Sequence, residues 1–503
     1  MFVDYTWQDW IALGNDKSKR QEMLYKIVDA YRSSHDFQYA LTAAKYFIGE
    51  NPTIRRKVVL SMGAQKVDDP NDPTGKRKRT VRRQVELKGV QMPNRQLYTF
   101  ITQENQHLLG NGVSFSGEDD VKARLGVNFD TDLSRMGEKA LLHGVCYAYW
   151  NYDHMEIMPS AVDQASGCVV LVDERNSVPM MAVQFWQVSN TRPVYFRLFE
   201  PDGVTVYRTT KGKKELEITE PKRHYVQTTY TDAAGTDVVD EHDYVALPVI
   251  PLYANDERMS ELTDALREKI DCYDRILSDF GDNLQRANDV YWVLNNFGGT
   301  KDDILEMLED IRNLRAVASY SDGVGSSSTA EPKTIEVPYA ARQVALDVLR
   351  KAMYDDAMAL DMSQLTGGSL TNVAIKAATA NLNLKCDRFE WQVVDFMKKL
   401  LSLIGAPEAA DRMTFTRRII TNDTETIQAI YQAREDIDQR TALKLNPLIN
   451  PDDIEDIIAA TEAEKQAHAA DFDAIDQIVA GMTNGQQRPT QAPTEGGVNG
   501  AEE

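Results

Sequence analysis

The sequence lacks the motifs that identify the commonest enzyme classes. It contains no G-x-x-x-x-G-K-[ST] phosphate loop and no H-E-x-x-H, G-x-S-x-G or G-x-G-x-x-G stretch. No two of its seven histidines are spaced as metal ligands on one element. We interpret His143, which precedes Gly144 at a predicted helix end, as a structural cap rather than a catalytic base.

Cysteines and long apolar runs are also scarce. The four cysteines (Cys146, Cys168, Cys272 and Cys386) are too far apart for a C-x-x-C motif, which indicates reduced, partly buried thiols in a cytoplasmic protein. No stretch of 18 or more uncharged apolar residues exists, and no basic segment followed by an apolar run opens the chain. We therefore expect neither a membrane span nor an export signal.

Basic charge is in the minority, with 56 Lys and Arg against 77 Asp and Glu. A surface that grips nucleic acid throughout needs clustered cations, so this class is disfavoured, whereas a protein that lets DNA slide past is not. The run Lys76–Arg83 has six basic residues in eight, which is typical of a solvated loop and less often of a contact for DNA or an acidic partner. From about Asn484 onward, the Gln-, Pro- and Gly-rich acidic tail is predicted to be disordered.

The chain length and the spacing of apolar and turn-forming residues predict an α+β protein of two to four modules. The 503 residues are 42% hydrophobic and 26% charged, within the soluble globular range. Helical spacing covers about the first 50 residues, and the Asp-Pro pairs in Val67–Gly75 predict a loop. Short β-rich runs between Val145 and Ile250, among them 146–150 and 194–199, predict antiparallel strands. Leu247–Pro251 closes this region because two nearby prolines resist helix and central strand.

The second half is predicted to be mainly helical. Apolar residues at intervals of three and four predict one long amphipathic helix over 257–287 and further helices over 340–360 and 372–404, the last with an apolar second half that must be buried. A small unit over 288–339 is predicted to contain strands at 291–294, 316–320 and 334–337 and a helix at 301–312. Short helices are predicted at about 424–432, 439–445 and 451–468. The other face of the first long helix carries six acidic residues, which we expect to be exposed: Asp264, Glu268, Asp271, Asp274, Asp279 and Asp282.

Three strings, in this order, resemble the portal proteins of bacteriophages with long non-contractile tails. Leu109–Phe115 is similar to a segment in which a helix ends at glycine and enters a V-x-F strand, Leu247–Pro251 to the V-P-I-I-P entry of the stem, and Met413–Arg417 to an M-T-F-T-R stretch. Further matching positions accompany them: Asn94-Arg95, Asn255, Glu257, Asn422-Asp423 and Asn446-Pro447.

The resemblance implies a portal fold that assembles into a ring, commonly of about twelve subunits, at one capsid vertex of the virion. Its implied parts are the wing (1–256, with the apolar half of 372–404), stem helices (257–287 and 340–360), clip (288–339), tunnel loop (361–371), crown (405–483) and acidic tail (484–503). The acidic face of the first stem helix would line the channel.

Two sets of site residues follow from the resemblance alone. The tunnel loop, which lines the narrowest part of the channel, would contain Ser363, Gln364, Leu365, Thr366, Gly367, Gly368, Ser369 and Leu370. The partner-binding part of the clip would contain Asp302, Asp303, Glu306 and Glu309.

The implied partners are other copies of the chain, double-stranded DNA during packaging and ejection, the terminase large subunit, head-completion or adaptor proteins, the major capsid protein and scaffold. No membrane, cofactor, metal or enzymatic activity is implied, and assembly would occur in the host cytoplasm. Because the chain has no phosphate loop, we place the packaging ATPase on another protein.

Two alternatives remain. The pairs Asp302-Asp303, Asp355-Asp356 and Asp452-Asp453 could hold magnesium in a metal-dependent nucleic-acid-processing enzyme. Each lies at a predicted helix start or on a solvated face, where carboxylates favour the helix dipole or hydration, so we interpret them as structural. A cytosolic α+β adaptor without a viral role is the second alternative, and it predicts a monomer or dimer.

Overall fold

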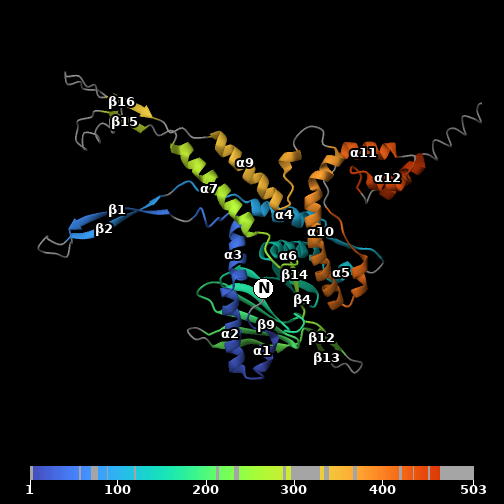
Figure 1. Cartoon of the computed structure of the whole chain (residues 1–503). Coiled ribbons are helices and arrows are strands. Elements are labelled where there is room, and N and C mark those ends of the chain that lie inside the picture. The colour runs from blue at the N-terminus through green and yellow to red at the C-terminus, as the bar shows by residue number, and fades with distance from the viewer. Residues whose placement is uncertain are drawn as a thin grey trace, which may run out of the picture. The chain divides into compact units, whose positions relative to one another are not determined.

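The protein combines helices with antiparallel sheets, which confirms the α+β prediction (Figure 1). The computed structural model describes residues 4–55, 58–68, 78–87, 89–117, 121–210, 215–231, 237–286, 291–295, 329–333, 339–365, 371–417, 422–433, 436–450 and 454–464. Two compact units are present: the first holds 1–364 and 378–419, the second 365–377 and 420–503.

The first layer of the first unit is a six-stranded antiparallel sheet covered on one face by the N-terminal helices. The helices are α1 (Trp7–Ala12), α2 (Lys17–Ser33) and α3 (His35–Ile48). The sheet has the order β11-β10-β9-β8-β7-β6, with β6 (Ala161–Asp163), β7 (Ser166–Val172), β8 (Pro179–Gln187), β9 (Val194–Glu200), β10 (Gly203–Thr209) and β11 (Leu216–Arg223). Trp10, Ile27 and Phe37 pack against Val183 and Phe196 in the core between them.

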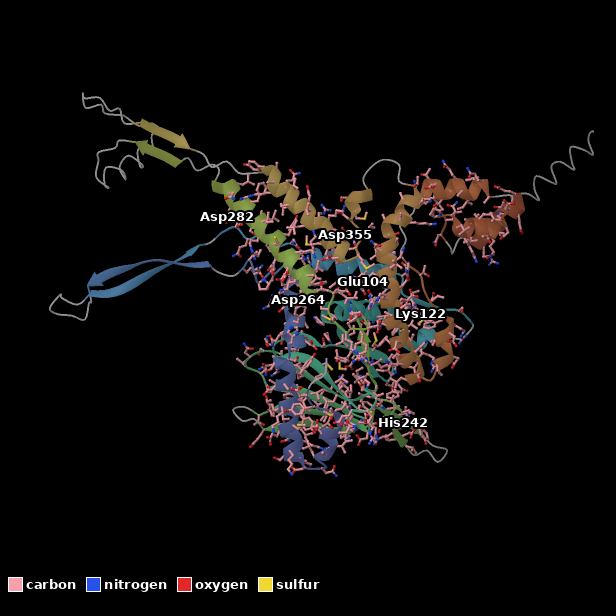
Figure 2. All side chains as sticks on the ribbon, in the orientation of Figure 1. Glu104, Lys122, His242, Asp264, Asp282 and Asp355 are labelled. Atoms are coloured by element: carbon pink, nitrogen blue, oxygen red, sulfur yellow. The ribbon has the colours of Figure 1, made fainter. Side chains whose placement is uncertain are left out.

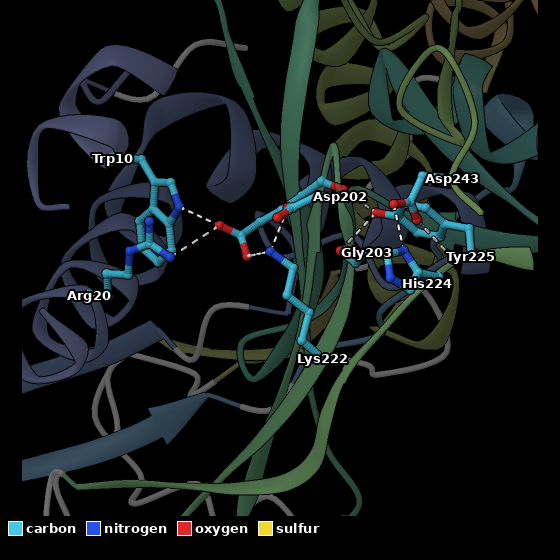
Figure 3. Close-up of polar contacts among 9 residues, drawn as sticks. Trp10, Arg20, Asp202, Gly203, Lys222, His224, Tyr225 and Asp243 are labelled. Atoms are coloured by element: carbon cyan, nitrogen blue, oxygen red, sulfur yellow. Dashed lines mark hydrogen bonds and ion pairs between the residues drawn. The ribbon is translucent and has the colours of Figure 1, made fainter. Parts of the chain in front are cut away.

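A buried carboxylate joins these helices to the sheet (Figure 3). Glu200 at the end of β9 accepts a hydrogen bond from Trp10 Nε1 (2.8 Å) and pairs with Arg20 (3.6 Å) and Lys222 (3.0 Å). A buried charge is tolerated when it is paired and hydrogen-bonded, and this one has partners on α1, α2 and β11. Nearby, the Tyr225 hydroxyl donates to the carbonyl of Glu200 (2.6 Å), at the root of the hairpin formed by β12 (Val226–Thr231) and β13 (Asp237–His242).

The second layer is a three-stranded sheet in the order β14-β4-β5, with β4 (Val145–Asn151), β5 (His154–Pro159) and β14 (Val249–Tyr253). Side chains alternate along β4: Val145, Tyr147 and Tyr149 face the six-stranded sheet, whereas Cys146, Ala148 and Trp150 face the helices beyond. Both faces are buried, so the sequence is continuously apolar. The prolines near 250 do not prevent a strand here, because β14 is at the sheet edge, where Pro251 is tolerated.

The third layer is helical: α4 (Gln96–Leu109), α5 (Val121–Leu125), α6 (Phe129–His143) and α10 (Asn372–Leu403). The predicted apolar half of α10 is buried, with Phe389, Val393, Phe396 and Leu400 at most 1% exposed. After α10, the 3-10 helix η2 (Pro407–Arg412) leads to β17 (Met413–Phe415), which pairs with β3 (Val113–Phe115). Residues 407–417 therefore belong to the first unit, whereas the division at 405 expected from the sequence groups them with the helices after residue 422.

Helix α7 (Asp264–Arg286) begins seven residues later than predicted and is about 35 Å long. The Asn255 side chain closes a turn with the backbone of Met259, and Ser260 Oγ and Glu261 N donate to the carbonyls of Leu142 and Leu141 at the end of α6. These bonds satisfy carbonyls that α6 leaves unpaired, so the linker stays non-helical although its apolar spacing is helical.

Helix α9 (Tyr339–Asp356) runs antiparallel to α7. Phe280 meets Tyr339 edge-on at 5.7 Å, and Lys269 pairs with Asp356 toward the other end. Between them, β15 (Tyr291–Asn295) pairs with β16 (Thr329–Lys333), so the strand expected at 291–294 is confirmed. The helix expected at 301–312 and the strands expected at 316–320 and 334–337 lie outside the described residues.

The basic run proved to be partly strand rather than loop. Residues 78–83 belong to β2 (Lys78–Leu87), which pairs antiparallel with β1 (Val58–Asp68) in a long hairpin (Figure 1). Val81, Val85 and Leu87 alternate with polar residues, a period of two that favours a strand despite the charge. A register shift between Met62 and Ala64 marks a bulge.

The second unit contains α11 (Asp423–Gln432), α12 (Gln439–Leu445) and a helix at 454–464. Thr371 and Asn372 start α10 in this unit, where Asn372 N donates to Glu425 (2.6 Å) and its side chain accepts from Asn422 N (2.7 Å). Neither α11 nor α12 contains a buried residue. The helices surround a cavity of about 400 Å³ that is lined partly by Ile430, Ile437, Leu443 and Ile457.

Replacing Gly144 with Ala should destabilise the first unit. Gly144 ends α6 at φ +86°, and an added Cβ would lie 2.6 Å from the carbonyl oxygen of Arg258. We expect a loss of about 3 kcal/mol in the free energy of unfolding, measured by urea titration. His143 beside it is buried, with burial lowering its pKa to about 3, so the left-handed glycine rather than an imidazolium terminates the helix.

The control is Gly14→Ala, at φ +60° with no atom within 4 Å of the added Cβ. It should cost about 1 kcal/mol, from backbone strain alone. Equal losses for the two variants would show that the contact with Arg258 is unimportant.

Candidate functional site

Helix α7 carries the acidic residues that the sequence singled out, and Asp264 and Asp282 lie toward its two ends (Figure 2). Asp274, at its middle, is fully buried. Its Oδ2 accepts from Asn51 Nδ2 (2.8 Å), and its Oδ1 accepts from both the backbone N (3.0 Å) and the side-chain Nδ2 (2.6 Å) of Asn94. Burial raises the pKa of Asp274 to about 6, despite these donors.

Neighbouring acids on α7 also bind parts of the chain that precede it by about 200 residues. Asp271 accepts from the Tyr46 hydroxyl (2.6 Å) and from Thr53 Oγ1 (2.9 Å). Asp282 accepts from Val90 N (2.7 Å), and Ser278, between the acids, accepts from Met92 N (3.0 Å).

The expectation of one exposed acidic face was therefore wrong for Asp274, which is buried, and for Asp271 and Asp282, which are half-buried. Their partners come from α3, from residues 51–53 after it, and from the extended segment 89–94, which cover this side of the helix. Asp264, Glu268 and Asp279 are exposed, although Asp264 accepts from the Tyr39 hydroxyl (3.0 Å).

The segment predicted as the tunnel loop is described at its ends. Its first residues form the 3-10 helix η1 (Met362–Leu365), and Thr366–Leu370 lie outside the described residues. Asp361 Oδ1 accepts from Ser363 N (3.0 Å) and Arg350 Nη2 (2.9 Å), which fixes the entry to the segment. The Gln103 amide forms two hydrogen bonds with the backbone of Leu360, at 3.0 and 3.1 Å.

A buried ion triad joins α4, the linker before α7, and α10. Lys385 Nζ lies 2.8 Å from Glu104 Oε2 and 2.7 Å from Glu261 Oε2. The side chains are 13%, 2% and 18% exposed, respectively. Burial opposes the charge on Lys385, but the two carboxylates outweigh it and raise the pKa of the lysine.

One lysine cannot neutralise two carboxylates, so with both glutamates ionised the triad carries excess negative charge in a largely buried site. Burial is the largest influence on Glu104, followed by attraction to Lys385 and repulsion by Glu261, and its pKa rises to about 8. Burial therefore favours the protonated form of Glu104, which would leave Lys385 paired with Glu261 alone.

Of the three acidic pairs, Asp355-Asp356 is the one that the structure describes. Asp356 pairs with Lys269, and Asp355 is exposed. In the described part of the chain, no three or more His, Cys, Asp or Glu side chains are grouped so as to hold a metal ion. The clip residues Asp302, Asp303, Glu306 and Glu309 lie outside the described residues, as do Asp452 and Asp453. No helix within the described ranges is long and apolar enough to cross a membrane.

Residues 31–468 match the family described as "Phage portal protein, SPP1 Gp6-like". The chain belongs to this portal family. The portal protein of Bacillus phage SPP1 is 24% identical over 476 residues, which cover 89% of this chain and 87% of the relative. The portal protein of Clostridium phage phiCD119 is 25% identical over 235 residues, 46% of this chain and 51% of that one, so the chain spans about half the length of this relative.

A weaker structural likeness is to a chain of the "Virion of native gene transfer agent (GTA) particle". It covers 68% of this chain and 83% of the other, with 8% identity and a TM-score of 0.36. At this TM-score the likeness carries no argument, so the portal assignment depends on sequence.

Sequence reasoning missed the triad of Glu104, Glu261 and Lys385 and the burial of Asp274. The available signal for the triad was Lys385 itself, which lies on the helix face that continues into Phe389 and Val393. Its partners are distant in sequence, so no local pattern identifies them. The portal motif Asn94-Arg95 did mark a structural position, because Asn94 binds Asp274.

Replacing Glu104 with Gln should flatten the pH dependence of stability. Because the folded pKa exceeds the ordinary value of 4.5, the stability contributed by Glu104 is full below that value and is lost as pH rises through about 8. The free energy of unfolding of the unmodified chain should therefore fall between about pH 5 and pH 8 more than that of Glu104→Gln. Urea titrations across this range measure the difference.

Two further variants make the test specific. Glu268→Gln, at an exposed carboxylate on α7, should keep the pH dependence of the unmodified chain. Lys385→Met leaves Glu104 and Glu261 without their cation and should cost about 3–5 kcal/mol at pH 8. Identical pH profiles for Glu104→Gln and the unmodified chain would contradict the assignment of the proton to Glu104.

Proposed function

We propose that this chain forms a ring of about twelve subunits at one capsid vertex, through which double-stranded DNA enters during packaging and leaves during ejection. The observation that carries this proposal is the portal family match over residues 31–468. The chain would be a non-enzymatic virion component, assembled in the host cytoplasm.

The arrangement of α7 and α9 supports the assignment of these helices as the stem. They form an antiparallel pair, with the clip segment 288–339 connecting them at one end and the tunnel segment 361–371 following α9 at the other. The layered sheets and helices before α7, with the buried half of α10, would form the wing. The helices of the second unit would form the crown, with its boundary near 420.

Electrostatics favour loose passage of DNA along the stem. The exposed acids Asp264, Glu268 and Asp279 would repel phosphates, whereas a wall of Lys and Arg would bind them and release counterions at each step, acting as a brake. We assign only these three of the six acids to the channel, because Asp271, Asp274 and Asp282 are bound within the chain.

The tunnel segment would make the closest contact with DNA. Ser363–Leu370 contains no charged residue, so its contacts would be weak and independent of base sequence. Its entry is fixed in the first unit by Asp361, and its exit in the second unit by the hydrogen bonds of Asn372. Gly367 and Gly368 would give neighbouring subunits freedom to hold this segment differently.

The clip would provide the docking surface for the terminase large subunit and later for head-completion or adaptor proteins. The two-stranded β15–β16 pair is marginal alone, so neighbouring copies would cover its edges. Asp302, Asp303, Glu306 and Glu309 are the partner-binding residues that we propose. The wing would contact the major capsid protein and scaffold.

The purified protein should assemble into rings of about twelve copies with a central hole. A head-to-tail interface that is repeated by rotation closes into a ring. Native mass spectrometry gives the copy number, and negative-stain images show the hole. A chain that stays monomeric at high concentration, and remains so after addition of scaffold, would contradict the proposed function.

Reversing the charge at Glu268 and Asp279 should slow DNA passage without preventing assembly. In Glu268→Lys with Asp279→Lys, phosphates would be held along the stem, and packaged DNA should fall about tenfold at low salt and recover as salt is raised. Packaging into assembled shells with terminase and ATP measures this. Glu268→Gln with Asp279→Asn is the matched control and should package normally. Unchanged packaging by rings of the lysine variant would remove these residues from the channel.

A further inference from the structure

The extended segment 89–94 lies along α7 in a regular ladder of hydrogen bonds. The donors are alternate backbone N–H groups, at Val90, Met92 and Asn94, and the acceptors are Asp282, Ser278 and Asp274, each four residues apart. Alternate residues of an extended chain are about 6.6 Å apart, and four helical residues rise about 6 Å. The two repeats nearly match, so three successive bonds can form without bending either element.

The local sequence permits this close approach. A Cβ on Gly89 would lie 2.6 Å from Asp282 Oδ2, and one on Gly281 would lie 3.0 Å from Val90 Cγ1. Pro93 falls between two donors, where its missing N–H costs no hydrogen bond, and it holds Met92 extended. Ser278 Oγ donates to the carbonyl of Asp274 (2.7 Å) while it accepts from Met92 N, so its hydroxyl bonds both to its own helix and to the segment.

Segment 89–94 is the root at which the chain leaves the β1–β2 hairpin. The root at which the chain enters the hairpin, residues 51–53, is bound to the same helix. Asn51 Nδ2 donates to Asp274, and Thr53 Oγ1 donates to Asp271, shortly before β1 begins at Val58. The chain that enters the hairpin and the chain that leaves it therefore meet at Asp274. A carboxylate that accepts from both roots holds them in one register on α7.

We propose that α7 and the two roots of the β1–β2 hairpin move as one body, with Asp274 as the positioning residue that joins them. A tilt of α7 would then be transmitted to the hairpin and to whatever the hairpin contacts. The proposal goes beyond the proposed function and concerns a single chain, so it does not require a ring or DNA.

Spin labels can measure this coupling in the full chain. Cys272 on α7 is exposed, whereas Cys146, Cys168 and Cys386 are buried, so the native thiol labels the helix and Ser61→Cys places the second label on β1. Dilution with unlabelled chain removes distances between subunits. The distance distribution should be narrow in this labelled protein and broaden when Asp274→Asn is added, while Asp279→Asn, at an exposed acid of α7, leaves it unchanged.

Amide exchange tests the ladder one bond at a time. Ser278→Ala removes the acceptor of Met92 N, and exchange of that amide should rise roughly fivefold while amides in β4 and α6 stay protected. A merely structural effect would raise exchange throughout the unit. If Asp274→Asn does not fold, Ser278→Ala carries both measurements. An unchanged distance distribution together with unchanged exchange at Met92 would overturn the proposal, whether or not the chain forms rings.

Discussion

Burial of the apolar half of α10 is the constraint on which the first unit depends. Phe389, Val393, Phe396 and Leu400 can leave water only if α4, α6 and the start of α7 converge on them, and these elements share one core. The same helix carries Lys385 one turn before Phe389. Burial of the apolar stripe therefore also buries the Lys385 ammonium group. Glu104 and Glu261 then offset a desolvation cost that apolar packing imposes.

Helix α7 shows how one residue type takes different roles on different faces of a helix. Leu266 and Ile270 face the core, Asp271 and Asp274 accept from neighbouring segments, and Glu268 faces solvent. A buried aspartate with several donors restricts geometry, whereas an exposed one mainly contributes charge. Some acidic residues of this helix therefore hold neighbouring segments in place, and others contribute negative charge to the surface.

The sequence correctly predicted those helices and strands whose structure follows from the periodicity of their own apolar residues. Helix α12 has the predicted bounds Gln439–Leu445, and the predicted strands near 146–150 and 194–199 are β4 and β9. The start of α7 was missed because Met259 and Leu262 continue the helical spacing, while bonds from Asn255 and Ser260 to neighbouring backbone override it. The strand at 78–87 was missed because the density of charge obscured its alternation.

The candidate site was less predictable than the fold for the same physical reason. Asp274 and Glu268 have similar local sequences. Asp274 differs because Asn51 and Asn94 bind it in the folded chain. The motif Leu109–Phe115 located the end of α4 and the strand β3, but the motifs did not say which side chains face inward. Contacts between residues about 200 positions apart leave no local periodic signal.

The outer strand of the six-stranded sheet limits how copies of the chain can join. In β11, residues after Leu216 are exposed and include Glu217, Glu220, Pro221 and Lys222, while β6 at the opposite edge has three residues. The charged side chains of β11, the missing N–H of Pro221 and the short length of β6 each discourage pairing with a strand of another molecule. Extension of this sheet from one molecule to the next is therefore disfavoured, so these edges oppose fibrous aggregation when copies of the chain are concentrated.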